Sequence, residues 1–192
     1  MTRSAAGLAR VAFQGEAGAF SEEALRAYFG EQEGVVVLPR RAFRGVAEAA
    51  VSGEAEYGIL PVENTISGRV TDACDVLSTS SLAVVGEIVR PIRHCLLGVN
   101  AAGFEEIRQV ISHPAALAQC KRFLSALRAV DVVGVYDTAG AAREVATRRE
   151  PALAAVASRV AGDRYGLAVL AADIQDRTDN RTRFVIVARR AS

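Results

Sequence analysis

Short, uninterrupted apolar runs recur along this chain and alternate with segments of helical periodicity. Val35–Leu38 and Tyr57–Leu60 are two such runs. The segment between them spaces its apolar residues as one face of a helix, at Phe43, Val46, Ala47, Ala50 and Val51. Continuous apolar strands are typical of parallel sheets that helices cover on both faces. The pattern therefore predicts an α/β fold with mostly parallel sheets.

The order of the runs indicates two α/β lobes around a central cleft. Two extended segments, 82–86 and 92–99, flank Pro91 and are interpreted as the crossing from one lobe to the other. The chain is expected to return near residues 173–176. We predict that lobe 1 comprises residues 1–88 and 176–192 and lobe 2 residues 89–175. This arrangement is similar to the type II architecture of periplasmic binding proteins.

The composition excludes several classes of protein. A net charge of +1 over 192 residues gives no electrostatic case for a nucleic-acid or anionic-membrane partner. No apolar window approaches the length of a membrane-spanning helix, and residues 1–10 lack the apolar stretch of a signal peptide. Cys74, Cys95 and Cys120 lie far apart, which disfavours a disulfide scaffold or a zinc site. We expect a cytoplasmic protein without a metal.

Polar turns are predicted where strands lead into helices, at Gly15–Gly18, Glu63–Thr65, Ser112–Pro114, Asp137–Thr138 and Ser158. Such junctions form the ligand crevice of open α/β sheets, and helix N-termini bind anions. Although helix capping alone explains any one of them, the set predicts a site for a small anionic metabolite. No phosphate-loop or dinucleotide-binding glycine pattern is present, which disfavours a nucleotide. Ser21 is the expected N-cap of the first helix.

The chain has two histidines, and they are expected to differ in role. His113 is at a predicted helix start and is the better candidate for a site, whereas His94 lies within an apolar strand and is predicted to be a core residue. Glu63 and Asn64 can be interpreted in two ways. They are either a catalytic acid with the residue that orients it, or ordinary residues in the first turn of a helix.

The segment Asn180–Phe184 holds two arginines, a hydroxyl and a carboxamide at the start of an apolar run. Polar clusters at the mouth of a buried strand are common sites of chemistry in α/β proteins. On residue types alone a solvated turn is favoured, with Arg181 and Arg183 paired to Asp176 and Asp179.

Motifs spread over the whole chain change that interpretation, because they resemble the prephenate dehydratase family. They are GEAGAFSE (15–22), GILPVENT (58–65), PIRHCL (91–96), SHP (112–114) through AQC (118–120), DTAGAA (137–142), AVAS (155–158), and IQD (174–176) leading to NRTRF (180–184). Ala115 stands where the family often has Gln, and Thr65 where Ser is common. Many relatives continue into an ACT-type regulatory domain, whereas this sequence stops at Ser192. The resemblance then implies a catalytic unit on which phenylalanine has little effect.

The resemblance implies decarboxylating dehydration of prephenate to phenylpyruvate in L-phenylalanine biosynthesis, by a homodimer that needs no metal or organic cofactor. Thr182 is the family's catalytic residue and would protonate the leaving hydroxyl. We hypothesise that it is polarised by Arg183, with Glu63 as a further catalytic residue. The expected substrate-binding residues are Asn64, Thr65, Ser112, His113, Ala115, Gln119, Thr138, Ala139, Asn180 and Phe184.

Three alternatives remain open on the sequence. An arogenate dehydratase would act on the amino counterpart of prephenate, and the sequence does not separate a keto from an amino side chain. A prephenate decarboxylase would retain the ring hydroxyl, which an intact Thr182 argues against. A non-enzymatic module that binds a small anion would also use a two-lobed cleft, although the expected lack of a secretion signal and the Thr-Arg-Phe element count against it.

Overall fold

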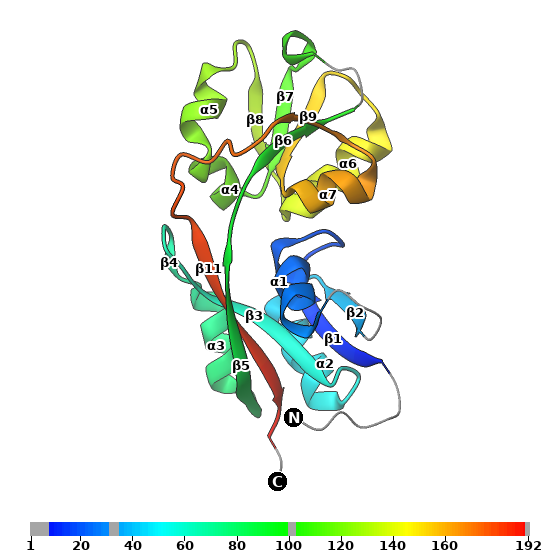
Figure 1. The fold of residues 1–192 in the computed structure, drawn as a ribbon, viewed down its shortest axis with the longest axis vertical. Coiled ribbons are helices and arrows are strands. Elements are labelled where there is room, and N and C mark those ends of the chain that lie inside the picture. Colours follow the sequence, from blue (N-terminus) through cyan, green and yellow to red (C-terminus); the bar gives the residue numbers. More distant parts are fainter. Residues whose placement is uncertain (1–7, 31–34, 100–102, 191–192) are drawn as a thin grey trace.

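The chain folds into two α/β lobes, stacked along the long axis of the molecule (Figure 1). A computed structural model describes residues 8–30, 35–99 and 103–190. Lobe 1 contains β1 (Ala9–Gln14), α1 (Phe20–Phe29), β2 (Val35–Arg40), α2 (Phe43–Ser52), β3 (Tyr57–Asn64), β4 (Gly68–Arg69), α3 (Thr71–Thr79), β5 (Leu82–Pro91) and β11 (Arg181–Arg189). Lobe 2 contains β6 (Cys95–Gly98), the 3₁₀ turn η1 (Phe104–Glu106), β7 (Gln109–Ser112), α4 (Pro114–Gln119), α5 (Lys121–Ala126), β8 (Asp131–Gly134), α6 (Thr138–Arg148), β9 (Leu153–Ala157), α7 (Arg159–Tyr165) and β10 (Ala168–Ala171).

Each lobe is built on one sheet, so the predicted two-lobed α/β class is confirmed. The strand order is β2-β1-β3-β11-β5 in lobe 1, with β4 paired to β3, and β10-β6-β9-β7-β8 in lobe 2. Both sheets are mixed and not mostly parallel. β1 pairs in parallel with β2 and β3, and β7 with β8 and β9, whereas β11, β5, β6 and β10 pair antiparallel to their neighbours. The antiparallel strands are those next to the two crossings between the lobes.

Two segments connect the lobes. β5 extends to Pro91, three residues past the boundary predicted at residue 88, and β6 begins at Cys95. The return runs from Ala171 at the end of β10 to Arg181 at the start of β11. We propose these two crossings as the lobe boundaries. Residues 1–7 and 191–192 of the predicted lobe 1 lie outside the described residues.

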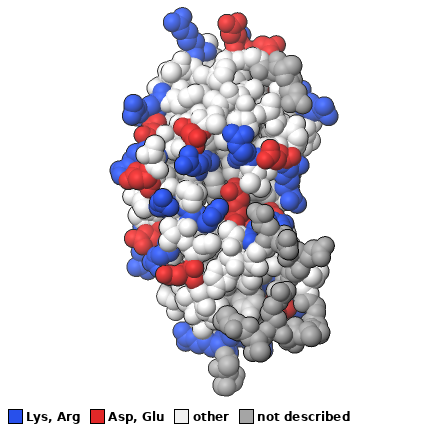
Figure 2. Space-filling model, viewed as in Figure 1, with Lys and Arg blue, Asp and Glu red and all other residues white. Residues whose placement is uncertain are grey.

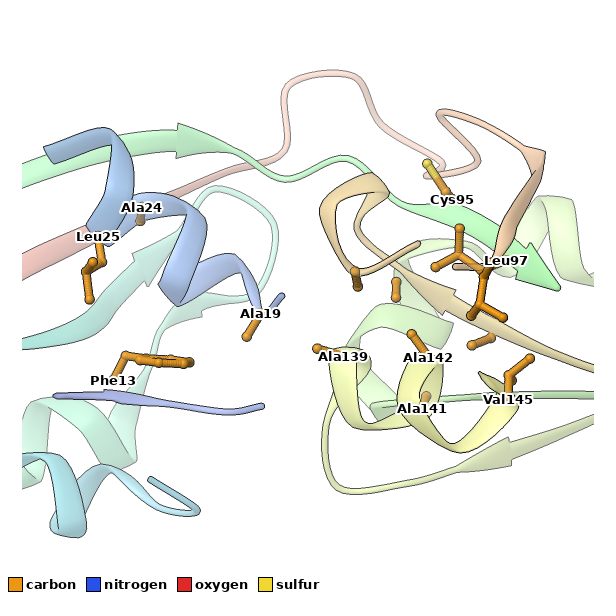
Figure 3. Close-up of a cluster of buried hydrophobic side chains, with 14 of the residues drawn as sticks. Phe13, Ala19, Ala24, Leu25, Cys95, Leu97, Ala139, Ala141, Ala142 and Val145 are labelled. Carbon is orange, nitrogen blue, oxygen red and sulfur yellow. The ribbon is translucent and has the colours of Figure 1, made fainter. Parts of the chain in front are cut away.

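One apolar cluster belongs to both lobes. It includes Phe13 and Leu25 of lobe 1 together with Leu97 and Val145 of lobe 2, all with no exposed side-chain surface. Figure 3 shows Ala19, just before α1, between the lobe 1 group and Ala139 at the start of α6. Because buried apolar area is the main stabilising term, this shared cluster holds the lobes together beyond the two connecting segments.

The polar turns differ from the prediction at two places. Ser21 does not cap α1: the N-cap is Ala19, which makes no side-chain hydrogen bond, and Ser21 lies buried inside the helix. Glu63–Thr65 does not begin a helix, since β3 continues to Asn64 and turns into β4, and α3 starts only at Thr71. The predicted caps at Asp137 and Ser158 are confirmed by their side-chain hydrogen bonds to Gly140 N and Ala161 N.

No helix among the described residues is long and apolar enough to cross a membrane. Nor does any group of three or more His, Cys, Asp and Glu side chains in the described ranges have the arrangement to hold a metal ion.

Candidate active site

Thr182 is the second residue of strand β11 and lies beside the carboxyl end of β3. In the antiparallel register Thr182 is opposite Asn64, and both side chains are 7% exposed. The Asn64 amide Nδ2 donates to Thr182 Oγ1 over 2.9 Å. Since β1 and β3 are parallel, their carboxyl ends and the start of β11 meet at one edge of the sheet, which faces lobe 2. The Thr182 hydroxyl is therefore placed at the junction of the lobes.

The direction of the hydrogen bond between Asn64 and Thr182 follows from the backbone. Asn64 Oδ1 accepts from the amides of Ile66 (2.9 Å) and Ser67 (3.0 Å), which can only donate. The Nδ2 group must then face Thr182 and the side-chain oxygen of Asn180, 2.8 Å away. Because the Thr182 oxygen accepts, its own proton remains available for donation to another group.

These residues belong to a longer set, the polar chain, formed by His94, Gln119, Asn180, Asn64 and Thr182. Asn180 Nδ2 donates to Gln119 Oε1 over 2.9 Å, and His94 Nε2 lies 2.9 Å from the same oxygen. Gln119 comes from α4 of lobe 2, so the polar chain extends from one lobe to the other. His94 is 2% and Asn180 1% exposed, which makes these bonds stronger than they would be in water.

His94 is a neutral Nε2–H tautomer in this arrangement. Gln119 Oε1 is an acceptor, so His94 must donate through Nε2, and its buried Nδ1 has no partner among the described residues. Burial lowers the pKa of His94, opposed by the hydrogen bond to Gln119. Sequence reasoning placed His94 in the core and overlooked its bond to a site residue, because Gln119 is distant in sequence and contacts it only through the fold.

Among the described residues, the hydrogen bonds of the Arg183 side chain go to Glu63 and Glu87 and not to the Thr182 hydroxyl, which Arg183 was hypothesised to polarise. Arg183 and Glu63 are register partners on neighbouring strands, and Arg183 is bonded to Glu63 over 3.2 Å and to Glu87 over 3.5 Å. Side chains alternate along a strand, so Arg183 shares a face with Val185, opposite to the face of Thr182 and Phe184. The group that contacts the Thr182 hydroxyl is the Asn64 amide, not a guanidinium.

Several predicted binding residues make contacts within the protein. Ser112 is fully buried and donates to Val156 O over 2.5 Å, and Phe184 and Ala139 belong to the shared apolar cluster. The Thr65 hydroxyl bonds Asp179 O (2.8 Å) and accepts from Arg181 N (2.9 Å), so it fastens the β3–β4 turn to the returning crossing. The hydroxyls of Ser112 and Thr65 are therefore engaged in hydrogen bonds with backbone groups.

A cleft of about 610 Å³, here called the large cavity, opens between the lobes. Lobe 2 contributes His113 and Thr138, both predicted, and lobe 1 contributes the cations Arg41 and Arg44. The wall residues that sequence reasoning missed are Gln14, Ala19, Phe20, Ser21, Arg41, Ala42, Phe43, Arg44, Val70, Asp72, Val76, Tyr136 and Asp137. The GEAGAFSE and DTAGAA motifs already marked the segments around Phe20 and Asp137.

A second space of about 260 Å³, the small cavity, is bordered by Ala115 and Gln119 of lobe 2 and by Ser67 of the β3–β4 turn. Phe20 of the large cavity packs edge-on against His94, with ring centroids 5.3 Å apart. The polar chain thus adjoins the small cavity through Gln119 and the large cavity through Phe20. Thr182 is not among the described residues that border either one.

A polar clasp, formed by Glu16, Tyr136 and Arg143, joins the two lobes beside the large cavity, which Tyr136 borders. Glu16 of lobe 1 accepts from Tyr136 Oη and, over 2.8 Å, from Arg143 Nη1 of lobe 2. Burial and the hydrogen bond to Glu16 raise the pKa of Tyr136 to about 12. Tyr136 is therefore a neutral donor at physiological pH.

Residues 11–192 match the family model described as prephenate dehydratase. The chain is 42% identical over 180 residues to the Arabidopsis thaliana protein "arogenate dehydratase/prephenate dehydratase 2, chloroplastic", covering 94% of this chain and 46% of that one. It spans about half the length of the curated relatives it matches.

Two solved structures show the fold. A prephenate dehydratase from Arthrobacter aurescens, in complex with L-Phe, has a TM-score of 0.86 at 29% identity, over 95% of this chain and 61% of that one. A nutrient-binding protein from Burkholderia cenocepacia, bound to methionine, has a TM-score of 0.52 at 12% identity, over 95% and 85%. The second likeness concerns the fold alone and fits the predicted periplasmic-binding-protein architecture.

Proposed function

The chain belongs to the prephenate dehydratase family, and we propose that it converts prephenate to phenylpyruvate, carbon dioxide and water in aromatic amino-acid biosynthesis. The observation that carries this proposal is the hydroxyl of Thr182, held by the Asn64 amide at the lobe junction over 2.9 Å. The family match includes every member of the polar chain.

The reaction needs a proton at one atom. As the ring carboxylate leaves as carbon dioxide, its C–C bonding electrons enter the ring and the C–O bond to the hydroxyl breaks. The leaving hydroxide takes the Thr182 proton to become water, and Thr182 regains a proton from solvent. Aromatisation of the ring drives the step, and a positioned acid typically accelerates it about a hundred- to ten-thousand-fold.

A threonine hydroxyl is a weak acid, so its oxygen has to be polarised. In this proposal the Asn64 N–H performs that role by donating to Thr182 Oγ1, and it leaves the hydroxyl proton directed elsewhere. Asn180, Gln119 and His94 hold the Asn64 amide in place. Arg183 and Glu63 act as an ion pair on the other face of the sheet.

We infer that the dianionic substrate binds in the large cavity. Arg41 and Arg44 offer guanidinium groups for carboxylates, which arginine binds well, and Thr138 and His113 add polar contacts from lobe 2. Phe20 and Phe43 give an apolar wall for the ring. Because Thr182 is 7% exposed and borders neither the large nor the small cavity among the described residues, we infer that the lobes or the Phe20 side chain move before substrate reaches the hydroxyl.

Arogenate is the second candidate substrate. The Arabidopsis relative bears both activities in its name, and Asp72 in the wall of the large cavity offers a carboxylate for the ammonium group of arogenate. The two substrates differ only at that keto or amino side chain.

The proposal is tested by incubating the purified chain separately with prephenate and arogenate and identifying the product by chromatography. We expect phenylpyruvate from prephenate. Phenylalanine from arogenate, with prephenate unchanged, would transfer the assignment to the second candidate. Tight binding of either compound without turnover would contradict both and favour the non-enzymatic binding module.

We also propose a cytoplasmic homodimer, on the resemblance to the family, although the Arabidopsis relative is named as chloroplastic. Light scattering on the purified chain should give twice the monomer mass of 20.3 kDa. A species of 20.3 kDa at all concentrations would contradict the dimer.

A further inference from the structure

A third space of about 250 Å³, the hinge cavity, lies beside the two connecting segments, and no residue of the polar chain is among the described residues that border it. It is bordered by α1, by the crossing after β5, by the start of α7 and by the returning crossing. The wall residues are Phe20, Glu23, Arg90, Pro91, Arg93, Cys95, Ser158, Arg159, Val160, Ala172 and Asp173. The proposed reaction uses none of its charged residues, and of these only Arg93 lies within one of the family motifs, PIRHCL (91–96).

The charges of this cavity are unevenly matched. Arg93 and Asp173 pair with each other over 2.8 Å. Arg90 and Arg159 form no ion pair with any other described residue. Two guanidinium groups are therefore available to an anion. Figure 2 shows basic and acidic side chains side by side at mid-height of the molecule, where the lobes meet.

Glu23 supplies the opposite charge. Its Oε1 atom is buried without a hydrogen-bond partner among the described residues. A buried acceptor that lacks a donor is costly, and such groups in native proteins usually have a partner that is not part of the chain. Burial raises the pKa of Glu23, opposed by the Ser158 hydroxyl and by the charge of Arg90. A bound cationic donor would satisfy this oxygen.

The backbone beside the cavity is also unusual. Asp173 adopts φ 54°, in the left-handed region that is unfavourable for most residues other than glycine. Residues held in such conformations are frequent at ligand sites. The ion pair with Arg93 keeps Asp173 in place.

We propose that the hinge cavity binds a free α-amino acid, with its carboxylate on Arg90 and Arg159 and its ammonium group on Glu23. The set of two unpaired cations and one unpaired carboxylate matches a zwitterion better than a simple anion, which would leave Glu23 Oε1 without a donor. Phe20, Pro91, Val160 and Ala172 give the apolar surface for its side chain. Phe20 also borders the large cavity, so the two sites share a wall.

Calorimetric titration of the purified chain tests this assignment without any measurement of turnover. L-alanine, L-leucine and L-phenylalanine are titrated separately, and we expect at least one to bind. Arg159→Gln should weaken that binding about tenfold to a hundredfold, the usual effect of losing one charge-assisted hydrogen bond. Arg128→Gln, an exposed arginine of lobe 2 outside the cavity, should leave it unchanged.

A second variant tests the ammonium contact. Glu23→Gln should weaken binding of the amino acid and leave binding of the matching carboxylic acid, which lacks the amino group, unchanged. Absence of binding by all three amino acids would overturn the proposal. So would binding that Arg159→Gln does not weaken, or a carboxylic acid that binds the wild-type chain as tightly as the amino acid.

Discussion

Among single residues, the proposed proton transfer depends on which side chain holds the Thr182 hydroxyl. The amide of Asn64 does so, and its orientation follows from the backbone donors of Ile66 and Ser67. Arg183 is bonded to carboxylates on the other face. The two residues therefore give opposite expectations for mutagenesis.

Asn64→Asp keeps the acceptor for the Ile66 and Ser67 amides and removes the donor to Thr182. We expect kcat to fall about tenfold to a hundredfold, the equivalent of one lost hydrogen bond in the transition state, with the fold intact by circular dichroism. Arg183→Gln is the matched control and should change kcat little, because an exposed ion pair contributes little. Equal losses of kcat in the two variants would indicate that Arg183 takes part in catalysis.

The lowered pKa of His94 predicts that the stability of the fold depends on pH. This pKa in the folded state lies below the ordinary value of 6.5, so the unfolded chain binds a proton first as pH falls. The stability due to neutral His94 is present above about pH 6.5 and is lost as pH drops toward the folded-state pKa. Urea unfolding from pH 7.5 to 5.5 should show a steeper loss for wild type than for His94→Gln.

His113→Gln is the control, since His94 and His113 are the only histidines of the chain. It should retain the steep loss of wild type. If His94→Gln and wild type lose stability in parallel, His94 is not held neutral by burial.

The residue types of the site were predictable, but their partners were not. The Asn-Arg-Thr-Arg-Phe segment marked Thr182, and the Pro-Val-Glu-Asn segment marked Asn64. Which of Glu63 and Asn64 faces Thr182 depends on the register between strands some 120 positions apart, which no local pattern determines. The bond from His94 to Gln119 was hidden for the same reason.

At the scale of elements, the loop Gly15–Ala19 fastens lobe 1 to lobe 2. Ser158 Oγ donates to Gly18 O over 3.0 Å, and Tyr165 Oη donates to Ala17 O over 2.8 Å. Gly18 has φ +91°, and a Cβ there would lie 2.9 Å from Ala161 Cα. Glycine is required twice, by the backbone angle and by the close approach of α7.

Gly18→Ala should therefore lower the free energy of unfolding more than Gly53→Ala does. Gly53 has a similar φ of +81°, and no atom lies within 4 Å of a Cβ built there. Comparing the two variants separates the cost of a positive φ, which both share, from the clash with Ala161, which only Gly18→Ala makes. We expect this clash to add about 1–3 kcal/mol. Urea denaturation measures both variants, and equal losses would show that α7 can shift away from this loop.

The strands and helices were largely predictable from their apolar runs, and the caps at Asp137 and Ser158 from their side chains. The turn after Asn64 was not. Its Glu and Asn residues resemble a helix start, but the amides of Ile66 and Ser67 bond to Asn64 Oδ1 and close a hairpin into β4. A side chain that satisfies backbone donors serves a tight turn as well as a helix N-terminus.

At the scale of the whole molecule, the two lobes share an apolar cluster and a polar clasp, while Thr182 remains buried between them. The two-lobed class followed from the sequence. The mixed sheets did not, because β11 pairs between β3 and β5, and long-range antiparallel pairing leaves no periodic signal in short buried strands.

Locking the lobes should stop turnover if access to Thr182 requires them to move. Glu16 and Arg143 bond across the clasp at 2.8 Å, so cysteines at both positions, in a Cys74→Ser background, can be joined by a short bifunctional reagent with a reducible link. We expect loss of activity on cross-linking and recovery on reduction. The single variant Glu16→Cys, treated identically, is the control. Full activity in the locked protein would show that movement of Phe20 alone admits substrate.

The central claim is that Thr182, polarised by Asn64, protonates the hydroxyl that leaves prephenate. The most direct measurement is kcat and KM of Thr182→Ala with prephenate, beside Thr182→Ser, which keeps the hydroxyl. We predict that Thr182→Ala lowers kcat about a hundred- to ten-thousand-fold with KM nearly unchanged, since the proton is needed only in the transition state, and that Thr182→Ser retains most of the rate. A Thr182→Ala protein that turns over prephenate at close to the wild-type kcat would contradict the claim.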